Sequence, residues 1–378
     1  MFQGGFVSWF LFYSFLPFAL YSLGLALYKM KNIELQREFT KAEYNAGEKL
    51  VVKVKMKRRS SFPLFYMVIE DSLSEELAFS LKSSSAKTFV FPYFRKAIEF
   101  EYMIDELPRG EHHFKGIQIK IGDPLGLIEK QITFPTVDDK IIVYPAYEEI
   151  IYRTLDNHYD QGMTASRERV QRDTSMAIGI RDYQPGDRFS WINWKATAKR
   201  NEIMTKEFEQ RKSHDVYVVM DCASDHHFEV VVSFVASTIR AILKKGAQVG
   251  LLSSSTERVA FPTRSGEAHL QQMNYHLAKV KDSSPVPLEV ILEGEGFTIG
   301  QNASLMLVTG QLTKSLIEKA SYYSSRNGIV TIFLMKNRDE STTDQERAFK
   351  AQANARGIRV VFVHSGQFSA AFTEVNRG

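Results

Sequence analysis

One short loop carries the residue types in this chain that are best suited to chemistry. It reads Asp221-Cys222-Ala223-Ser224-Asp225-His226-His227 and follows an apolar run. Carboxylates and hydroxyls, here those of Asp221, Ser224 and Asp225, are the ligands that Mg²⁺ prefers. Cysteine and histidine suit Zn²⁺, and a thiolate can act as a nucleophile. The loop is therefore the first candidate for a metal or catalytic site.

Two features of this loop favour a structural interpretation. Cys222 is the only cysteine, which excludes a disulfide within the chain and a multi-cysteine zinc site. At the end of a strand, a cysteine is more often a small buried apolar group than a nucleophile. Adjacent histidines point in different directions on most backbones, so we expect His226 and His227 not to converge on one ion. The pair His112-His113 is a weaker candidate.

A second stretch, Gly179–Glu209, concentrates aromatic and cationic residues. Pro185-Gly186 predicts a turn, and Asp187 is placed to cap the helix that follows. Trp191 and Trp194 are three residues apart and would share one face of that helix.

The charges of this stretch allow two interpretations. Lys195, Lys199 and Arg200 would fan over the other side of the predicted helix. Tryptophan and arginine dominate binding hot spots, which would make the stretch a binding surface. The residues alone favour the alternative, in which the tryptophans wedge the segment against the following domain and the charges are solvated.

The elements that must position these residues begin with an apolar segment. Phe6–Tyr28 contains no charge and exceeds the roughly 20 residues that a spanning helix needs. No basic residue precedes it and no small-x-small cleavage site follows, which favours an anchor over a signal peptide. The flanking cations lie after it: Lys29, Lys31, Arg37 and Lys41. The positive-inside rule then predicts a single-pass protein of the cell membrane with its remaining residues in the cytoplasm.

Residues 33–147 show a strand pattern. In Leu50–Lys57, apolar residues alternate with lysines, as in a half-buried strand. Similar runs follow at Leu64–Glu70, Thr88–Phe94, Ala97–Ile104, Gly116–Ile121 and Lys140–Val143. We expect an antiparallel β-sandwich here, after a transmembrane anchor in residues 1–32.

Residues 213–378 alternate between apolar strands and helices. Strands are predicted at Asp215–Asp221, Ala247–Ser253, Ser304–Val308, Ile329–Met335 and Ile358–His364, with an edge strand at Arg258–Phe261. Helices are predicted at His227–Lys245, Glu267–Val280, Thr313–Arg326 and Thr343–Arg356. This pattern predicts a doubly wound parallel sheet. Residues 148–212 form the connecting segment, and we expect its part at Arg167–Asp173 to be flexible.

The motif at Gly179–Trp194 carries a family resemblance. It follows a Gly-x-Arg-[Asp/Glu]-Tyr-x-x-Gly-Asp core with a later Ile-x-Trp, matched by Gly179, Arg181, Asp182, Tyr183, Gly186, Asp187, Ile192 and Trp194. Together with Asp123–Leu127 and Val143–Pro145, these residues resemble the bacterial family labelled domain of unknown function 58, of the YeaD-like kind. Nearly the whole chain is covered by this resemblance.

The resemblance implies a C-terminal domain like the von Willebrand factor A (vWA) module. It also implies partners, namely a MoxR-type AAA+ ATPase and a transglutaminase-like membrane protein, and a role as an adaptor in such systems. Members commonly have two spanning helices, whereas this chain shows one.

The metal site of vWA modules is degraded in this chain. Such modules bind a divalent cation through Asp-x-Ser-x-Ser, a threonine from a second loop, and an aspartate after the fourth strand. Asp221 is retained, but Ala223 and Asp225 occupy the two serine positions. The later loop, Val308-Thr309-Gly310-Gln311, lacks the acid, and Thr263 is the candidate for the second-loop hydroxyl. We therefore expect no cofactor, with Mg²⁺ held by Asp221, Asp225 and Thr263 as the minor alternative.

We predict a non-enzymatic protein-binding adaptor. Its binding residues are the motif positions Arg181, Asp182, Tyr183, Gly186, Asp187, Trp191, Trp194 and Lys195, and the loop positions Asp221, Ser224 and Asp225. Loops at the carboxyl ends of the parallel strands would form the binding face, because such sheets bind ligands there. The alternative is a metal-assisted hydrolase that uses Asp221, Asp225 and His227.

Nucleic-acid binding ranks last among the functions considered. The net charge of +4 is small for 378 residues. The cations Lys195, Lys199 and Arg200 are interspersed with glutamates at positions 202, 207 and 209, so they form no continuous basic stripe. The sequence also lacks a Gly-rich phosphate loop and a nucleophile elbow.

Overall fold

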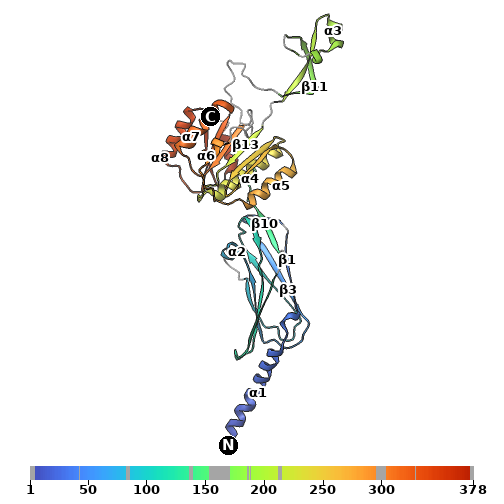
Figure 1. Cartoon of the computed structure of the whole chain (residues 1–378), viewed down its shortest axis with the longest axis vertical. Helices are drawn as coiled ribbons and strands as arrows, with labels where there is room; N and C mark the ends of the chain where they lie inside the picture. The colour runs from blue at the N-terminus through green and yellow to red at the C-terminus, as the bar shows by residue number, and fades with distance from the viewer. Residues whose placement is uncertain are drawn as a thin grey trace. The chain divides into compact units, whose positions relative to one another are not determined.

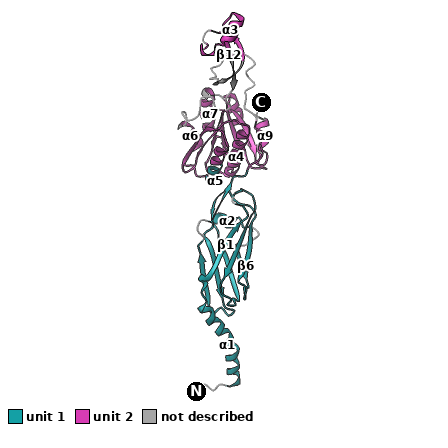
Figure 2. Cartoon of the chain, turned by 90° about the vertical axis from the view of Figure 1, so that its right-hand side faces the viewer, with its two compact units in different colours: residues 1–146, 274–279 teal, residues 147–273, 280–378 magenta. Residues whose placement is uncertain are grey.

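A computed structural model describes residues 5–41, 43–81, 86–135, 139–152, 171–184, 187, 189–211, 215–294, 304–327 and 329–374. It divides into two compact units, coloured separately in Figure 2. Unit 1 comprises residues 1–146 and 274–279, and unit 2 comprises residues 147–273 and 280–378.

Unit 1 begins with the predicted apolar helix. Helix α1, Phe6–Leu27, is 22 residues long and contains no charged residue. Among the described residues it is the helix that is long and apolar enough to cross a membrane. It ends at Tyr28, whose backbone is extended, and a 3-10 turn, η1 (Met30–Asn32), leads into the first strand.

Ten strands of unit 1 form three sheets (Figure 1). The first has the order β1-β3-β6, the second β2-β10-β7, and the third β5-β4-β8-β9. The strands are β1 (Ile33–Phe39), β2 (Glu43–Asn45), β3 (Leu50–Arg58), β4 (Tyr66–Ser72), β5 (Lys87–Val90), β6 (Ala97–Ile104), β7 (Gly110–His113), β8 (Gly116–Gly122), β9 (Glu129–Phe134) and β10 (Lys140–Tyr144). One short helix, α2 (Glu75–Phe79), follows β4.

Side chains of all three sheets share one apolar core. Val52 and Val54 of β3, Ile69 of β4 and Val143 of β10 are fully buried in it. Alternation in β3 puts these valines inside and Lys53 outside, as the sequence predicted. The pairing is antiparallel except between β2 and β10, which run parallel.

Unit 2 is built on a six-stranded sheet with the order β15-β14-β13-β16-β17-β18. The strands are β13 (Val216–Met220), β14 (Val249–Ser254), β15 (Arg258–Arg264), β16 (Ser304–Thr309), β17 (Val330–Lys336) and β18 (Arg359–His364). All neighbours pair in parallel except the edge strand β15, which is antiparallel to β14. Strand β13 is buried at every position, which explains its unbroken apolar sequence.

Helices cover both faces of this sheet. On one face, α6, α7 and α8 contribute to a cluster that includes Val219 and Ile332. On the other face, Phe234 of α4 packs on Phe333 of β17, and both contact Phe372 of α9. The helices are α4 (Phe228–Lys244), α5 (Glu267–Lys279), α6 (Leu288–Gly294), α7 (Lys314–Asn327), α8 (Asp344–Ala355) and α9 (Phe368–Glu374). The sequence pattern did not predict α6 or α9.

The family motif lies on a separate feature of unit 2, which we call the arm. It consists of β11 (Gln171–Asp182), η2 (Phe189–Trp191), α3 (Trp194–Arg200) and β12 (Met204–Arg211), with β11 and β12 paired antiparallel. The flexible connection expected at Arg167–Asp173 is therefore wrong from Gln171 onward, because these residues open β11. Positions 167–170 lie outside the described residues.

Candidate functional site

The first candidate site lies where the strand order of unit 2 reverses. From β13 the chain proceeds to β14 and β15 on one side and to β16, β17 and β18 on the other. The carboxyl ends of β13 and β16 therefore flank a switch point, where doubly wound sheets bind their ligands. Asp221 follows β13, and Thr309 ends β16. We call this region the switch-point site.

The Asp221 carboxylate is held by groups of its own fold. The Thr309 hydroxyl donates to Asp221 Oδ2 at 2.6 Å, and the Ala223 N–H donates to Oδ1 at 3.0 Å. Burial raises the pKa of the Asp221 carboxyl, although these two hydrogen bonds oppose the increase. The negative charges of Asp225 and Glu289 raise this pKa further.

Asp225 brings both adjacent histidines together. Its Oδ1 lies 2.7 Å from His226 Nδ1, and its Oδ2 lies 3.2 Å from His227 Nδ1. The two ring centroids are 3.7 Å apart. The expectation that these rings would diverge is therefore wrong. His227 directly precedes α4 and has an αR backbone. Adjacent side chains there do not point to opposite sides, as they would in a strand.

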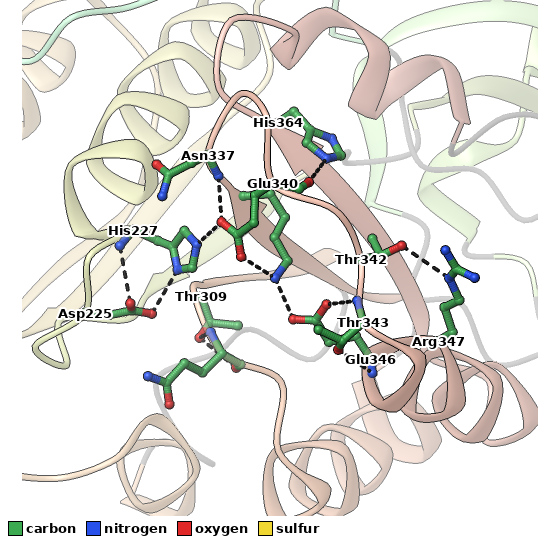
Figure 3. A network of polar contacts seen from close by, with 12 residues as sticks. Asp225, His227, Thr309, Asn337, Glu340, Thr342, Thr343, Glu346, Arg347 and His364 are labelled. Carbon is green, nitrogen blue, oxygen red and sulfur yellow. Dashed lines mark hydrogen bonds and ion pairs between the residues drawn. The ribbon is translucent and has the colours of Figure 1, made fainter.

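A polar network extends from His227 through Glu340 to Lys336, the last residue of β17 (Figure 3). His227 Nε2 lies 2.6 Å from Glu340 Oε2, and Lys336 Nζ donates to Glu340 Oε1 at 2.8 Å. The same ammonium donates to Glu346 Oε1 at 2.6 Å. Burial would raise the pKa of Glu340, but Lys336, His227 and the Asn337 N–H outweigh it and lower that pKa to about 2.

Sequence reasoning missed this network. Lys336 ends β17 and is only 3% exposed, whereas a lysine at a strand end usually reaches solvent. One local signal was available. Thr343 and Glu346 form a capping box at the start of α8, and the Thr-x-x-Glu spacing is readable in the sequence. The long-range pairing of Glu340 with His227 had no such signal.

Gly310 allows the loop after β16 to approach the loop after β13 closely. A Cβ atom at this position would lie 2.2 Å from Asp225 Oδ2 and 3.0 Å from His227 Cβ. Any side chain at Gly310 would therefore displace the Asp225 carboxylate.

The predicted magnesium set is only partly assembled. Thr263 lies beside Arg264, which pairs with Val249, the first residue of β14. Asp221 follows the last residue of β13, so it lies at the opposite edge of the sheet, where the parallel strands end. The Thr263 hydroxyl is therefore not beside Asp221. Ser224 is exposed, and its hydroxyl lies 3.4 Å from Asp282 Oδ2. Cys222 is fully buried, as expected for a small core group.

A different set of potential ligands lies close together. One ligand atom from each of Asp225, His226 and His227 lies within 4.8 Å of the others. Carboxylate and imidazole are ligands that suit Zn²⁺. Glu340 stands against the other nitrogen of His227, where outer carboxylates orient metal-binding histidines.

The second candidate site is the tip of the arm, where short-range bonds position α3. Asn193 caps this helix by accepting from the Ala196 N–H at 3.2 Å. The Thr197 hydroxyl accepts from the Met204 N–H at 3.0 Å and thereby ties α3 to the start of β12. Ile192 forms a β-bridge with Thr205.

Two predictions about the arm are wrong. Asp187 does not cap α3; its Oδ1 accepts from Arg181 Nη2 at 2.7 Å, and its Oδ2 accepts from the Gln184 N–H at 3.1 Å. Trp191 and Trp194 do not share a helical face, because the first ends η2 and the second begins α3. The intervening Ile192-Asn193 breaks the helix that the spacing suggested.

Large apolar side chains are exposed on the arm. Phe189 is 76% exposed and Trp194 is 68% exposed, while Ile180 and Ile203 are each about half exposed. The Phe189 ring stacks at 6.5 Å on Tyr183. Lys195, Lys199 and Arg200 of α3 and the neighbouring Asp182 are also exposed. The motif position Gly186 and its neighbours Pro185 and Arg188 lie outside the described residues.

Comparison with known proteins identifies a family and a relative. The profile of the family "Protein of unknown function DUF58" matches residues 179–374, which run from the arm through the six-stranded sheet. The "Uncharacterized protein YeaD" of Bacillus subtilis (strain 168) is 40% identical over 371 residues. That alignment covers 98% of this chain and 92% of the relative.

Similarity to solved structures is slight. The CARDB domain of a Pyrococcus furiosus protein aligns with a TM-score of 0.19 and 7% identity, over 31% of this chain and 97% of that one. The sporulation control protein Spo0M of Bacillus subtilis aligns with a TM-score of 0.16 and 13% identity, over 30% and 49% of the two chains. At these TM-scores neither similarity bears on the fold of this chain.

Proposed function

We propose that this chain, which belongs to the DUF58 family, is a membrane-anchored adaptor that binds another protein and catalyses no reaction of its own. Two surfaces contribute to binding, the tip of the arm and the switch-point site. Helix α1 holds both at the cytoplasmic face of the membrane.

The proposed architecture is a β-sandwich followed by a vWA-like domain. The order of the six-stranded sheet supports the second part, since numbering its strands from β13 gives 3-2-1-4-5-6, the order of doubly wound nucleotide-binding sheets. An edge strand at Arg258–Phe261 was also predicted from the sequence, and β15, which includes these residues, pairs antiparallel with β14. The core shared by the three sheets of unit 1 supports the sandwich.

The exposure of Phe189 and Trp194 is the observation that carries the proposal. Soluble proteins rarely expose large apolar side chains in groups, and such groups mark interaction sites. Lys195, Lys199 and Arg200 are also exposed, and they belong to α3, the helix that Trp194 begins. Aromatic rings with cations around them favour a partner whose surface is apolar at its centre and acidic at its rim.

The proposed partner is a MoxR-type AAA+ ATPase, in a system that also contains a transglutaminase-like membrane protein. The family resemblance suggests both. The switch-point site supports an adaptor over an enzyme, because the Asp221 carboxylate is occupied by Thr309 and Ala223. These two donors fix the carboxylate in place, which favours a role for Asp221 in shaping the binding face.

The test is cross-linking from the arm in living cells. A photoreactive phenylalanine analogue replaces Trp194 in the full chain, and the covalent product is identified by mass spectrometry. We expect an AAA+ ATPase as the main product. The matched control carries the same analogue at Tyr322 of α7, which is 55% exposed and outside both proposed surfaces. Equal products from the two positions would argue against the arm as the binding surface.

A second variant tests the contribution of the switch-point site. We expect Asp221→Ala to weaken capture of the ATPase by the full chain in detergent, because Thr309 and Ala223 lose the acceptor that fixes their loops. Unchanged capture would exclude this face from the interface.

Metal-assisted hydrolysis is the second candidate function. The grouping of Asp225, His226 and His227 favours it, and the chemistry would be activation of a bound water. Metal analysis of the full chain, purified without chelator, separates the two functions. A stoichiometric transition metal that is lost in His226→Ala would favour the hydrolase. Metal at trace levels in both proteins would favour the adaptor.

A further inference from the structure

The carboxyl end of α1 is packed into unit 1 before the helix ends. Tyr21 stacks on Phe62 with ring centroids 5.6 Å apart, and the Phe65 N–H donates to the Tyr21 hydroxyl at 3.0 Å. One turn later, Gly24 approaches the Phe62 ring so closely that a Cβ atom would lie 2.9 Å from it. Leu25 is fully buried. In a membrane, the loops that pack on this helix end would therefore lie at the same depth as the helix end.

Helix length sets that depth. At 1.5 Å per residue, the 22 residues of α1 rise about 33 Å, close to the roughly 30 Å of a hydrocarbon core. Tyr21 lies about 9 Å before the end of the helix along its axis. If α1 spans the core, Tyr21 and the side chains packed on it lie at or below the boundary between headgroups and acyl chains.

The loops around this helix end expose a band of large apolar side chains. A series of ring contacts runs from Tyr21 to Phe65, from Phe65 to Tyr93, and from Tyr93 to Phe91. A second loop, which begins at Asp123, adds two leucines. The exposed members of the band, which we call the rim, are Phe65, Phe91, Tyr93, Phe94, Leu125 and Leu127.

Buried polar groups hold the rim in place. Arg58 is 3% exposed, and its guanidinium donates to the backbone carbonyls of Phe62, Tyr93 and Arg95, which fixes the two aromatic loops together. Asp123 is 1% exposed and accepts from the Ser22 hydroxyl of α1 at 3.1 Å and from the Ile128 N–H at 2.6 Å. These hydrogen bonds lower the cost of a carboxylate near lipid.

We propose that the rim is a lipid-binding surface that inserts into the membrane interface around the end of α1. Aromatic and aliphatic side chains favour this layer, in which tryptophan and tyrosine form belts in membrane proteins. Four exposed cations suit anionic headgroups: Arg95 and Lys96 directly follow Phe94 of the rim, and Lys29 and Lys31 follow the end of α1. The inference rests on the proposed anchoring by α1.

The experiment places single labels in the full chain, reconstituted in vesicles of phosphatidylcholine and phosphatidylglycerol in equal parts. Phe94→Cys and Leu127→Cys report on the rim, in a Cys222→Ala background. Lys49→Cys, at an exposed turn of unit 1, is the aqueous control. Leu11→Cys reports on α1 itself. An environment-sensitive fluorophore on each cysteine is quenched either by lipids brominated on the acyl chain or by aqueous iodide.

We expect brominated lipid to quench the labels at positions 94 and 127 several-fold more than the label at position 49, and iodide to show the reverse order. If position 11 is quenched by lipid while positions 94 and 127 match position 49, the rim proposal is overturned and anchoring stands. If position 11 is not quenched by lipid, anchoring fails, and the rim proposal fails with it.

Discussion

Gly310 is the residue on which the geometry of the switch-point site depends most directly. Its missing side chain allows the loop after β16 to lie against Asp225. We expect Gly310→Ala to destabilise the protein by about 1–3 kcal/mol, because the added methyl group must displace a carboxylate that two histidines hold. Urea unfolding of the full chain in detergent measures the change.

A double variant distinguishes this clash from a general effect of the substitution. If the methyl group acts through the Asp225 carboxylate, Gly310→Ala combined with Asp225→Ala costs less than the sum of the two single changes. Strict additivity would show that the clash is relieved elsewhere.

Glu340 gives the protein a pH dependence in the acid range. Its folded pKa of about 2 lies below the usual 4.5, so its contribution to stability is complete above about pH 4.5 and is lost as pH falls toward 2. The midpoint of thermal unfolding should therefore differ most between wild type and Glu340→Gln above pH 4.5. The two curves should converge near pH 2. Glu318→Gln, at an exposed position of α7, is the control. A difference that stays constant with pH would refute the assigned role.

For single residues, the sequence predicted the members of the switch-point site better than it predicted their hydrogen-bond partners. It singled out Asp221, Asp225 and His227, which do lie around the switch point. It did not place His226 and His227 on one carboxylate, because their convergence depends on where α4 begins. Nor did it reveal Glu340, which is 113 residues from His227 and approaches it only in the folded sheet.

Helices and strands were predictable from the sequence wherever burial produces a regular pattern of apolar residues. The predominantly apolar strands β13 and β17 were found from sequence because both of their faces are covered. Helix α6 was missed because it is only seven residues long and follows two prolines. Strand β11 was missed because its first half, Gln171 to Ser175, is polar and offers no alternation.

Helix α3 of the arm is a short helix, and one substitution can show what holds it in place. Thr197→Val keeps the shape of the side chain but removes the oxygen that accepts from the Met204 N–H. An unpaired N–H group costs about 1–3 kcal/mol, so we expect the Met204 amide to exchange its hydrogen about tenfold faster. Hydrogen exchange followed by mass spectrometry measures this. Thr263→Val, on β15, should leave exchange in the arm unchanged. Equal exchange in Thr197→Val and wild type would mean that other contacts hold α3.

For the whole molecule, the proposed orientation in the membrane depends on the cations that follow α1, and the fold holds these cations in different ways. The Arg37 side chain is fully buried in unit 1, where it pairs with Asp71 at 2.7 Å and with Asp139 at 2.5 Å. Lys41 pairs with Glu48 at 3.1 Å. Lys29 and Lys31 remain exposed beside the end of α1, and they are the cations on which the positive-inside rule acts most directly.

The corresponding prediction concerns the side of the membrane on which unit 1 lies. In protoplasts that express the full chain with Lys49→Cys and Cys222→Ala, a membrane-impermeant maleimide should label position 49 only after the membrane is opened. Labelling of intact protoplasts would place unit 1 outside. Lys29→Glu with Lys31→Glu removes the charge difference across α1, so we expect part of the population to become labelled without opening. If that variant stays fully protected, a determinant other than these two lysines sets the orientation.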